Sequence, residues 1–220
     1  MDFFTPEQDK QRAAGEGEVD EAQPWALILG DSISIGYTPF VRQYIAGRWN
    51  VRRPSANCGD TLAGLRNLDA WLGGRRWNVI HFNWGLHDLC YRHPEAKLYG
   101  NRDKVHGRIS VPLDQYEPNL RTLVQRLRSS ADRLIWADTT VVPPGEAGRF
   151  EGDDLKYNAV ARAIMKQEGI ETNDLHTLTA GFGPELFTAP GDVHFTEQGY
   201  RILGRQVAER IAGYGIPAAL

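Results

Sequence analysis

The chain has 220 residues, of which 41% are hydrophobic and 24% charged, and its formal net charge at pH 7 is −3. These proportions are those of an ordinary globular protein and exclude a disordered, collagen-like or coiled-coil chain. The longest uninterrupted apolar run, Trp25–Leu29, is far shorter than the ~20 residues of a membrane-spanning helix, so we expect no membrane partner.

Acidic side chains are concentrated at the start of the chain. Residues 1–23 hold seven acidic and two basic side chains, a net charge of −5 that leaves +2 for the remainder. We expect an acidic flexible leader over 1–23 and a single domain over 24–220. The domain lacks the basic stripe of a nucleic-acid-binding protein, so we expect no nucleic-acid partner. Without a signal-peptide pattern after Met1, we expect a cytoplasmic protein as the sequence stands, and a secreted or periplasmic one if a leader has been removed.

After this leader, short apolar runs alternate with stretches of helical period. The runs predict five strands, at Trp25–Leu29, Trp49–Arg52, Val79–Asn83, Leu134–Ala137 and Gly169–Thr172. Helix starts are predicted at residues that suit an N-cap, namely Thr38 (before Pro39), Asp60, Asp114 (with Glu117) and Thr196. Such alternation is typical of a parallel sheet with helices on both faces, in which ligands bind outside the carboxyl ends of the strands.

The first strand is followed directly by the residues Gly30-Asp31-Ser32. A serine at a strand-to-helix turn can project its hydroxyl over the sheet edge, and its own N–H can face a developing oxyanion. The alternative interpretation of an isolated Asp-Ser pair is a simple helix cap.

A second motif, Asp192-Val193-His194, lies in the loop before the last predicted helix. A histidine beside an acid can supply a general base and the group that orients it. A surface ion pair would explain this motif equally well by itself, but the two motifs at strand ends of one sheet support one another.

Two further segments follow the second and third strands, Asn57-Cys58-Gly59-Asp60-Thr61 and Gly85-Leu86-His87-Asp88. With these the chain resembles the SGNH hydrolases, also called GDSL-type esterases, whose four blocks run in this order as G-D-S, a lone Gly, G-x-N-D and D-x-x-H. The resemblance covers residues 25–212. It implies Ser32 as nucleophile, His194 as base and the N–H groups of Ser32 and Gly59 as oxyanion donors.

The sequence departs from the family pattern in two places. His87 stands where the family has its oxyanion asparagine, and we expect this imidazole to replace that donor, with Asn83 and Asn57 as alternatives. Asp192 is two rather than three residues before His194, and we expect it to orient the base all the same. A catalytically inactive relative is the other reading of these departures.

We therefore expect a three-layer α/β/α domain with a flavodoxin-like, five-stranded parallel sheet that needs no cofactor. The spacing of His81, His87 and His93 suits neither a helix nor a strand for joint ligation, so we expect no metal site. Cys58 and Cys90 are taken as free thiols, although the sequence leaves their pairing open.

The loop after the third strand offers the best indication of the substrate. Residues 90–110 carry a net charge of +3 with interspersed tyrosines and histidines, and they contain no run of large aliphatic side chains. A carbohydrate or an anionic sugar suits such a loop better than a long acyl chain does, but a solvated surface loop has the same composition.

By resemblance we favour a serine esterase that removes short acyl groups, acetyl above all, from a carbohydrate. An O-acyltransferase that uses the same residues and a non-catalytic sugar-binding relative remain the alternatives. The expected partner is a small-molecule or glycan ester, and the sequence does not indicate an oligomeric state.

Overall fold

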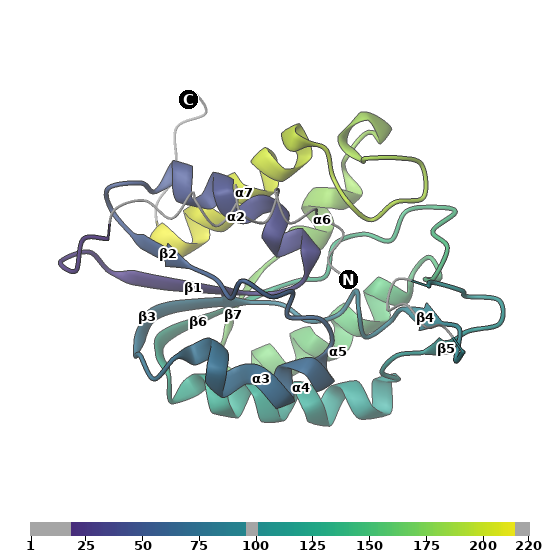
Figure 1. Cartoon of the computed structure of the whole chain (residues 1–220), viewed down its shortest axis with the longest axis horizontal. Coiled ribbons are helices and arrows are strands. Elements are labelled where there is room, and N and C mark those ends of the chain that lie inside the picture. The colour runs from purple at the N-terminus through teal and green to yellow at the C-terminus, as the bar shows by residue number, and fades with distance from the viewer. Residues whose placement is uncertain (1–18, 96–100, 214–220) are drawn as a thin grey trace.

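The computed structural model describes residues 19–95 and 101–213 and places a five-stranded sheet at the centre of the molecule (Figure 1). Its strands are all parallel and lie in the order β2-β1-β3-β6-β7. Their bounds are Trp25–Leu29 (β1), Asn50–Arg52 (β2), Trp77–Phe82 (β3), Ala131–Ala137 (β6) and Glu171–Asn173 (β7). Counted along the chain, the order is 2-1-3-4-5, which is that of flavodoxin-like sheets.

Helices cover both faces of this sheet (Figure 1). α2 and α7 pack together on one face, and α3, α4 and α5 pack side by side on the other. Their bounds are Ser32–Tyr44 (α2), Thr61–Leu72 (α3), Leu113–Arg128 (α4), Asp153–Glu168 (α5) and Glu197–Ala212 (α7). The predicted three-layer fold is therefore confirmed.

Shorter elements complete the architecture. The helix α6 and the 3-10 turn η1 connect β7 to α7, and β4 pairs with β5 in a small antiparallel lobe between β3 and α4. Their bounds are Tyr91–Arg92 (β4), Arg108–Ile109 (β5), Leu175–Ala180 (α6) and Pro184–Leu186 (η1).

The strand β1 lies between β2 and β3, and its carboxyl end leads straight into α2. Leu27, Ile28 and Leu29 are at most 2% exposed, because helices cover both sides of the strand. A strand buried on both faces is apolar throughout instead of alternating with polar residues, which explains why its sequence is a continuous apolar run.

Two glycines allow α2 and α7 to come into close contact. A Cβ atom on Gly36 of α2 would lie 2.2 Å from the ring of Tyr200 in α7, and one on Gly204 of α7 would lie 2.6 Å from the Cβ of Phe40 in α2. Carbon atoms pack at about 3.5–4.0 Å, so a larger side chain at either position would push the helices apart. The contact matters because α2 follows the first strand-end motif and α7 follows the last one.

Thr38 is not a helix N-cap, contrary to the sequence-based prediction. α2 begins at Ser32, and Asp31 caps it by accepting a hydrogen bond from the N–H of Ile33 at 3.0 Å. Pro39 lies inside the helix. A proline that follows a threonine usually marks the first turn of a helix. Here the helix has already begun at Ser32, and the packing of α2 on α7 stabilises it through Pro39.

Asp114 is not an N-cap either. α4 begins at Leu113, and Asp114 lies in its first turn, where a negative charge interacts favourably with the helix dipole. Asp60 and Thr196 do cap α3 and α7 through their side chains, as predicted. The sequence analysis named no start for α5, because Gly152 precedes this helix in place of a capping side chain.

The five strands of the central sheet were all predicted, and four of them shift by one to three residues at one or both ends, whereas β4 and β5 were not predicted. The last one begins later than predicted, because Gly169 ends α5 as its C-cap residue. Among the described residues, no helix is long and apolar enough to cross a membrane.

Part of the acidic leader lies within the described residues. The N–H of Asp20 donates to Oδ1 of Asn50 at the start of β2, and Nδ2 of Asn50 donates to the carbonyl oxygens of Asp20 and Gln23. This end of the leader is thus attached to the sheet. Residues 1–18 lie outside the described residues, so the flexible leader and the division into leader and domain stay predictions.

Candidate active site

Ser32 is the first residue of α2 and lies at the carboxyl end of the central strands. Its Oγ is 2.9 Å from Nε2 of His194. The first N–H groups of a helix have no partner inside the helix, and that of Ser32 has none elsewhere in the described part of the chain. The residue therefore presents both a hydroxyl and a helix N-terminal N–H to a ligand.

His194 lies in the tight loop between η1 and α7, opposite Ser32. Its Nδ1 is 2.7 Å from Oδ1 of Asp192, and the same oxygen accepts the backbone N–H of His194 at 3.1 Å. The other carboxylate oxygen accepts the hydroxyl of Thr188 at 2.9 Å. Although burial works in the opposite direction, the hydrogen bonds and charge of His194 hold the pKa of Asp192 well below its usual range. Ser32, His194 and Asp192 thus form one chain of hydrogen bonds.

Hydrogen bonds also join the other strand-end segments to one another. The N–H of Cys58 donates to the carbonyl of Gly30 at 3.2 Å, and the indole N–H of Trp84 donates to the carbonyl of Cys58 at 3.3 Å. Oδ1 of Asp88 accepts the N–H and the hydroxyl of Thr61 at 2.8 and 2.6 Å. The structure therefore brings the three segments after β1, β2 and β3 together at one edge of the sheet.

Gly59 occupies the turn between β2 and α3 with a φ of 59°, a left-handed conformation that glycine adopts without strain. Its N–H donates to Oδ1 of Asn57 at 2.9 Å. The amide that the family resemblance assigns to the oxyanion is thus bound to a side chain two residues earlier. Asn57 has to turn away from it, or share it, before a substrate oxygen can accept from Gly59.

His87 is 6% exposed and lies in the turn that follows β3. Burial, together with the charges of Arg149 and Arg92, lowers the pKa of His87 well below 6.5. The imidazole is therefore neutral, and a neutral imidazole has one N–H to donate. This protonation state suits an oxyanion donor.

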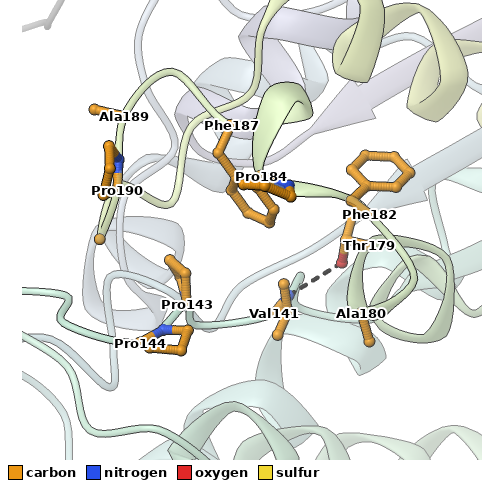
Figure 2. A pocket seen from close by; sticks show the side chains of 11 residues that line it. Val141, Pro143, Pro144, Thr179, Ala180, Phe182, Pro184, Phe187, Ala189 and Pro190 are labelled. Carbon is orange, nitrogen blue, oxygen red and sulfur yellow. Dashed lines mark hydrogen bonds between the residues drawn. The ribbon is translucent and has the colours of Figure 1, made fainter.

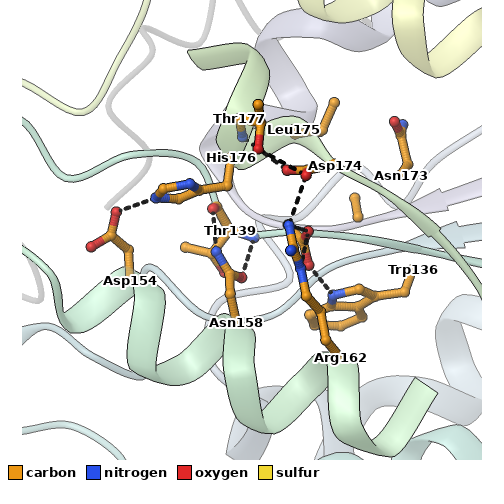
Figure 3. Close-up of polar contacts among 12 residues, drawn as sticks. Trp136, Thr139, Asp154, Asn158, Arg162, Asn173, Asp174, Leu175, His176 and Thr177 are labelled. Carbon is orange, nitrogen blue, oxygen red and sulfur yellow. Dashed lines mark hydrogen bonds and ion pairs between the residues drawn. The ribbon is translucent and has the colours of Figure 1, made fainter. Parts of the chain in front are cut away.

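The side chain of Asn83 binds the end of β6 and the segment that follows it. Its Nδ2 donates to the carbonyl of Ala137 at 2.7 Å and lies 3.3 Å from Oγ1 of Thr139. Asn158 of α5 pairs with both backbone groups of Thr139 from the other side (Figure 3). These bonds hold the ends of β3 and β6 together below the site.

The amino-acid sequence matches a known protein family. A model of GDSL-like lipases and acylhydrolases matches residues 28–202. The chain belongs to the GDSL-like lipase/acylhydrolase family. Lipases and acylhydrolases cleave carboxylic esters, and this GDSL-like hydrolase is a carboxylic ester hydrolase. Among curated proteins, none matches its sequence significantly.

Solved structures of esterases share the fold of this GDSL-like hydrolase. A lipase/acylhydrolase from Enterococcus faecalis is 18% identical, with a TM-score of 0.70 over 87% of this chain and 96% of that one. An acetylxylan esterase from Geobacillus stearothermophilus is 17% identical, with a TM-score of 0.68 over 89% and 97% of the two chains. A second acetyl xylan esterase is 14% identical, with a TM-score of 0.69 over 85% and 99%.

An apolar pocket of about 390 Å³ lies beside the loop that carries Asp192 (Figure 2), and its size is in the range of small-molecule sites. Its walls come from the loop after β6 and from the segment between α6 and α7, and they include Pro143, Pro144, Pro184 and Phe187. The sequence analysis missed this pocket, because its two walls are distant in the sequence and neither is apolar enough to attract notice alone.

The basic loop after β3 is partly engaged with the protein itself. Arg102 donates to Glu146 at 2.8 Å, and Nζ of Lys104 donates to the carbonyl of Arg149 at 3.3 Å. These two cations therefore attach the β4–β5 lobe to the loop between β6 and α5. Residues 96–100, with a further lysine and tyrosine of the predicted substrate loop, lie outside the described residues.

Histidine, cysteine and acidic side chains outside this chain of hydrogen bonds are the groups that could bind a metal ion. In the described part of the chain, no three His, Cys, Asp or Glu side chains are grouped as metal ligands would be. His176 pairs with Asp154 at 2.8 Å, which connects α6 to α5 (Figure 3). Cys58 and Cys90 are buried free thiols, and burial raises the pKa of Cys58 to about 11.

Sequence reasoning missed two contributions to the site. Thr188 fixes the second oxygen of Asp192, and nothing in the sequence indicates this contact within an irregular loop. Glu146 and Arg149 form a buried ion pair at 2.9 Å in an irregular loop, where the three-residue spacing that indicates a pair on a helix carries no signal.

Proposed function

We propose that this hydrolase is a serine esterase that removes short acyl groups, acetyl above all, from a carbohydrate. The observation that carries the proposal is the chain of hydrogen bonds from Ser32 through His194 to Asp192, at 2.9 and 2.7 Å. A hydroxyl bonded to an imidazole that is itself held by a carboxylate is the arrangement that activates serine for acyl transfer.

In the first step, Ser32 Oγ attacks the carbonyl carbon of the ester, and its proton passes to Nε2 of His194. The negative charge that develops on the carbonyl oxygen is stabilised by N–H donors, for which we propose Ser32, Gly59 and His87. The imidazolium then gives its proton to the leaving alcohol as the C–O bond breaks. Asp192 stabilises the imidazolium and keeps Nδ1 protonated.

In the second step, water attacks the acyl-serine and gives a proton to Nε2 of His194. Collapse of the second tetrahedral intermediate releases the carboxylic acid and returns the proton to Ser32 Oγ. Every proton moves between substrate, water and these side chains, so the reaction needs no cofactor.

The preference for acetyl esters of a carbohydrate has two supports. Two of the solved structures that share the fold are acetyl xylan esterases. The second support is that Asp31, the residue before Ser32, interacts electrostatically with Arg149 and His194, so charged and polar groups surround this turn. The apolar pocket of Figure 2 could take a longer acyl chain, so acyl-length preference tests the proposal directly.

The decisive experiment measures kcat/KM for p-nitrophenyl esters from acetate to octanoate, beside acetylated oligosaccharides, with Ser32→Ala as the control. We expect the highest kcat/KM for acetate and release of acetate from the oligosaccharides. A buried CH₂ contributes about 0.8 kcal/mol, so an acyl chain held in the pocket would instead raise kcat/KM about fourfold per CH₂. A steady rise toward octanoate would contradict the short-acyl proposal.

A serine-directed phosphonate followed by mass spectrometry tests the nucleophile itself. We expect the label on Ser32, and we expect Ser32→Ala to keep only the ~10³-fold rate enhancement over water that binding and oxyanion donors provide. A label on Ser34 would contradict the assignment. Acyl transfer to an added sugar at the expense of hydrolysis would identify an O-acyltransferase, and binding of acetylated sugars without any release of alcohol would identify a non-catalytic relative.

A further inference from the structure

A buried ion pair contacts the turn that contains His87. Nη1 of Arg149 donates to Oε1 of Glu146 at 2.9 Å, and Nε of the same guanidinium donates to the carbonyl of Leu86 at 2.7 Å. The side chains of Arg149 and Glu146 are 5% and 0% exposed. A buried arginine is thus fixed between the loop after β6 and the residue that precedes the proposed oxyanion donor.

We propose that Arg149 is a positioning residue for ester hydrolysis: fixed by Glu146, its guanidinium holds the carbonyl of Leu86 and thereby sets where the imidazole of His87 lies. This inference rests on the proposed function, because it assigns a task to Arg149 only if His87 donates to the oxyanion. It adds a residue that neither the family resemblance nor the motifs indicate.

Glu146 is itself held by further hydrogen bonds, which fix the carboxylate to which the guanidinium of Arg149 donates. Besides Arg149, its Oε1 accepts from Arg102 at 2.8 Å, and its Oε2 accepts the N–H of Gly148 at 2.6 Å. Arg149 uses two N–H groups of its planar fork in fixed directions, one to a carboxylate and one to a carbonyl. A lysine has no such fork and cannot reproduce both bonds in this geometry.

The charge of Arg149 also supports the proposed role of His87 as an N–H donor. Burial is the largest cause of the low pKa of His87, and Arg149 is the next, ahead of Arg92. A cation next to the imidazole opposes its protonation, so the ring stays neutral while His194 takes up and releases the catalytic proton. The two histidines are thereby kept in different roles.

A double-mutant cycle between Arg149→Met and His87→Ala tests the proposal on the full chain, with kcat and KM measured on p-nitrophenyl acetate. Loss of an oxyanion donor costs about 10²–10³-fold in kcat, which we expect for His87→Ala. A misplaced catalytic group costs up to about 10²-fold, which we expect for Arg149→Met with KM nearly unchanged. In the His87→Ala background, Arg149→Met should then lower kcat by no more than a few-fold, because the group that it positions is already gone.

Two further variants separate positioning from general stability. Arg133→Met removes an arginine that also donates to a carboxylate, that of Glu171, and to a backbone carbonyl, that of Arg210, and we expect its kcat within a few-fold of wild type. Arg149→Lys keeps the charge, should lose a large part of the kcat, and completes the cycle if Arg149→Met does not fold. Thermal unfolding of each variant checks that the comparison is between folded proteins.

Four outcomes would overturn the proposal. Losses from Arg149→Met and His87→Ala that multiply would mean that Arg149 acts independently of His87, and a higher KM at unchanged kcat would make it a binding residue. Full activity of Arg149→Lys would leave no role for the fork geometry. If His87→Ala keeps its kcat, the positioning role fails, whereas the proposed esterase is tested separately, by the label on Ser32 and by the loss of activity in Ser32→Ala.

Discussion

Asp192 holds His194 through two hydrogen bonds that share one carboxylate oxygen, one from the ring Nδ1 and one from the backbone N–H. An aspartate that accepts the backbone N–H two residues later forms an Asx-turn, which bends the chain so that the same carboxylate can also reach the ring of His194. The second oxygen is held by Thr188. A separation of two residues therefore suffices, although the family pattern has three.

Asp192→Asn tests this arrangement at the residue scale. The amide oxygen can still accept both N–H groups, but the variant loses the charge that stabilises the imidazolium in the transition state. We expect kcat on p-nitrophenyl acetate to fall by up to about 10⁴-fold, as in other serine triads. Thr188→Ala removes the bond to the other oxygen and the 3.2 Å contact of the hydroxyl with the carbonyl of His194 but keeps the carboxylate, and its smaller effect is the control. A near-wild-type kcat for Asp192→Asn would assign the orienting role to another group.

At the scale of elements, the distance between Ser32 and His194 depends on two helices. Ser32 opens α2, and His194 lies three residues before α7 begins at Glu197. These helices are in close contact at Gly36, where the ring of Tyr200 fills the space that a Cβ atom would need. The packing of α2 on α7 therefore influences how Ser32 and His194 lie relative to each other.

Gly36→Ala should therefore reduce activity as well as stability. The added methyl group has to displace a buried ring, which costs about 1–3 kcal/mol of unfolding free energy, and the displacement shifts α2 against α7. We expect kcat to fall in the folded variant, measured together with urea unfolding.

Leu127→Ala provides the matched control for the Gly36 variant. Leu127 is fully buried in α4, on the opposite face of the sheet. Its truncation should cost about 2–5 kcal/mol and leave kcat unchanged within a few-fold. If both variants lose stability and neither loses kcat, the α2–α7 contact has no influence on the site.

The sequence predicts the local features of this molecule better than the contacts between residues that are distant in the chain. Strand positions follow from apolar runs, and Ser32 could be assigned to the sheet edge because it follows β1 and ligands bind outside the carboxyl ends of parallel strands. His194 does not directly follow a strand, because α6 and η1 separate it from the end of β7. The start of α2 was wrong, since tertiary packing outweighs the proline signal at Pro39. The contact of Arg149 with Leu86 joins segments that are distant in the sequence, and no local pattern carries that information.

At the scale of the whole molecule, one buried carboxyl makes the stability of the fold depend on pH. Asp88 is fully buried; its Oδ1 accepts two bonds from Thr61, while its Oδ2 has no partner among the described residues. Burial raises the pKa of Asp88 to about 8, although the bonds from Thr61 act in the opposite direction. In the unfolded chain the same carboxyl titrates near its usual 3.8.

The sign of the effect follows from which state releases the proton. Between pH 4 and pH 8 the unfolded chain loses the proton of Asp88 and the folded protein keeps it, so the free energy of unfolding falls as the pH rises, and levels off above the folded pKa. Asp88→Asn keeps an oxygen that can accept both bonds from Thr61 but does not titrate. We expect the stability of the variant relative to wild type to rise by about 1.4 kcal/mol per pH unit between pH 5 and pH 7, measured by urea unfolding at each pH. All other groups titrate in both proteins, so the difference isolates Asp88, and parallel pH profiles would mean that this carboxyl is ionised in the folded protein.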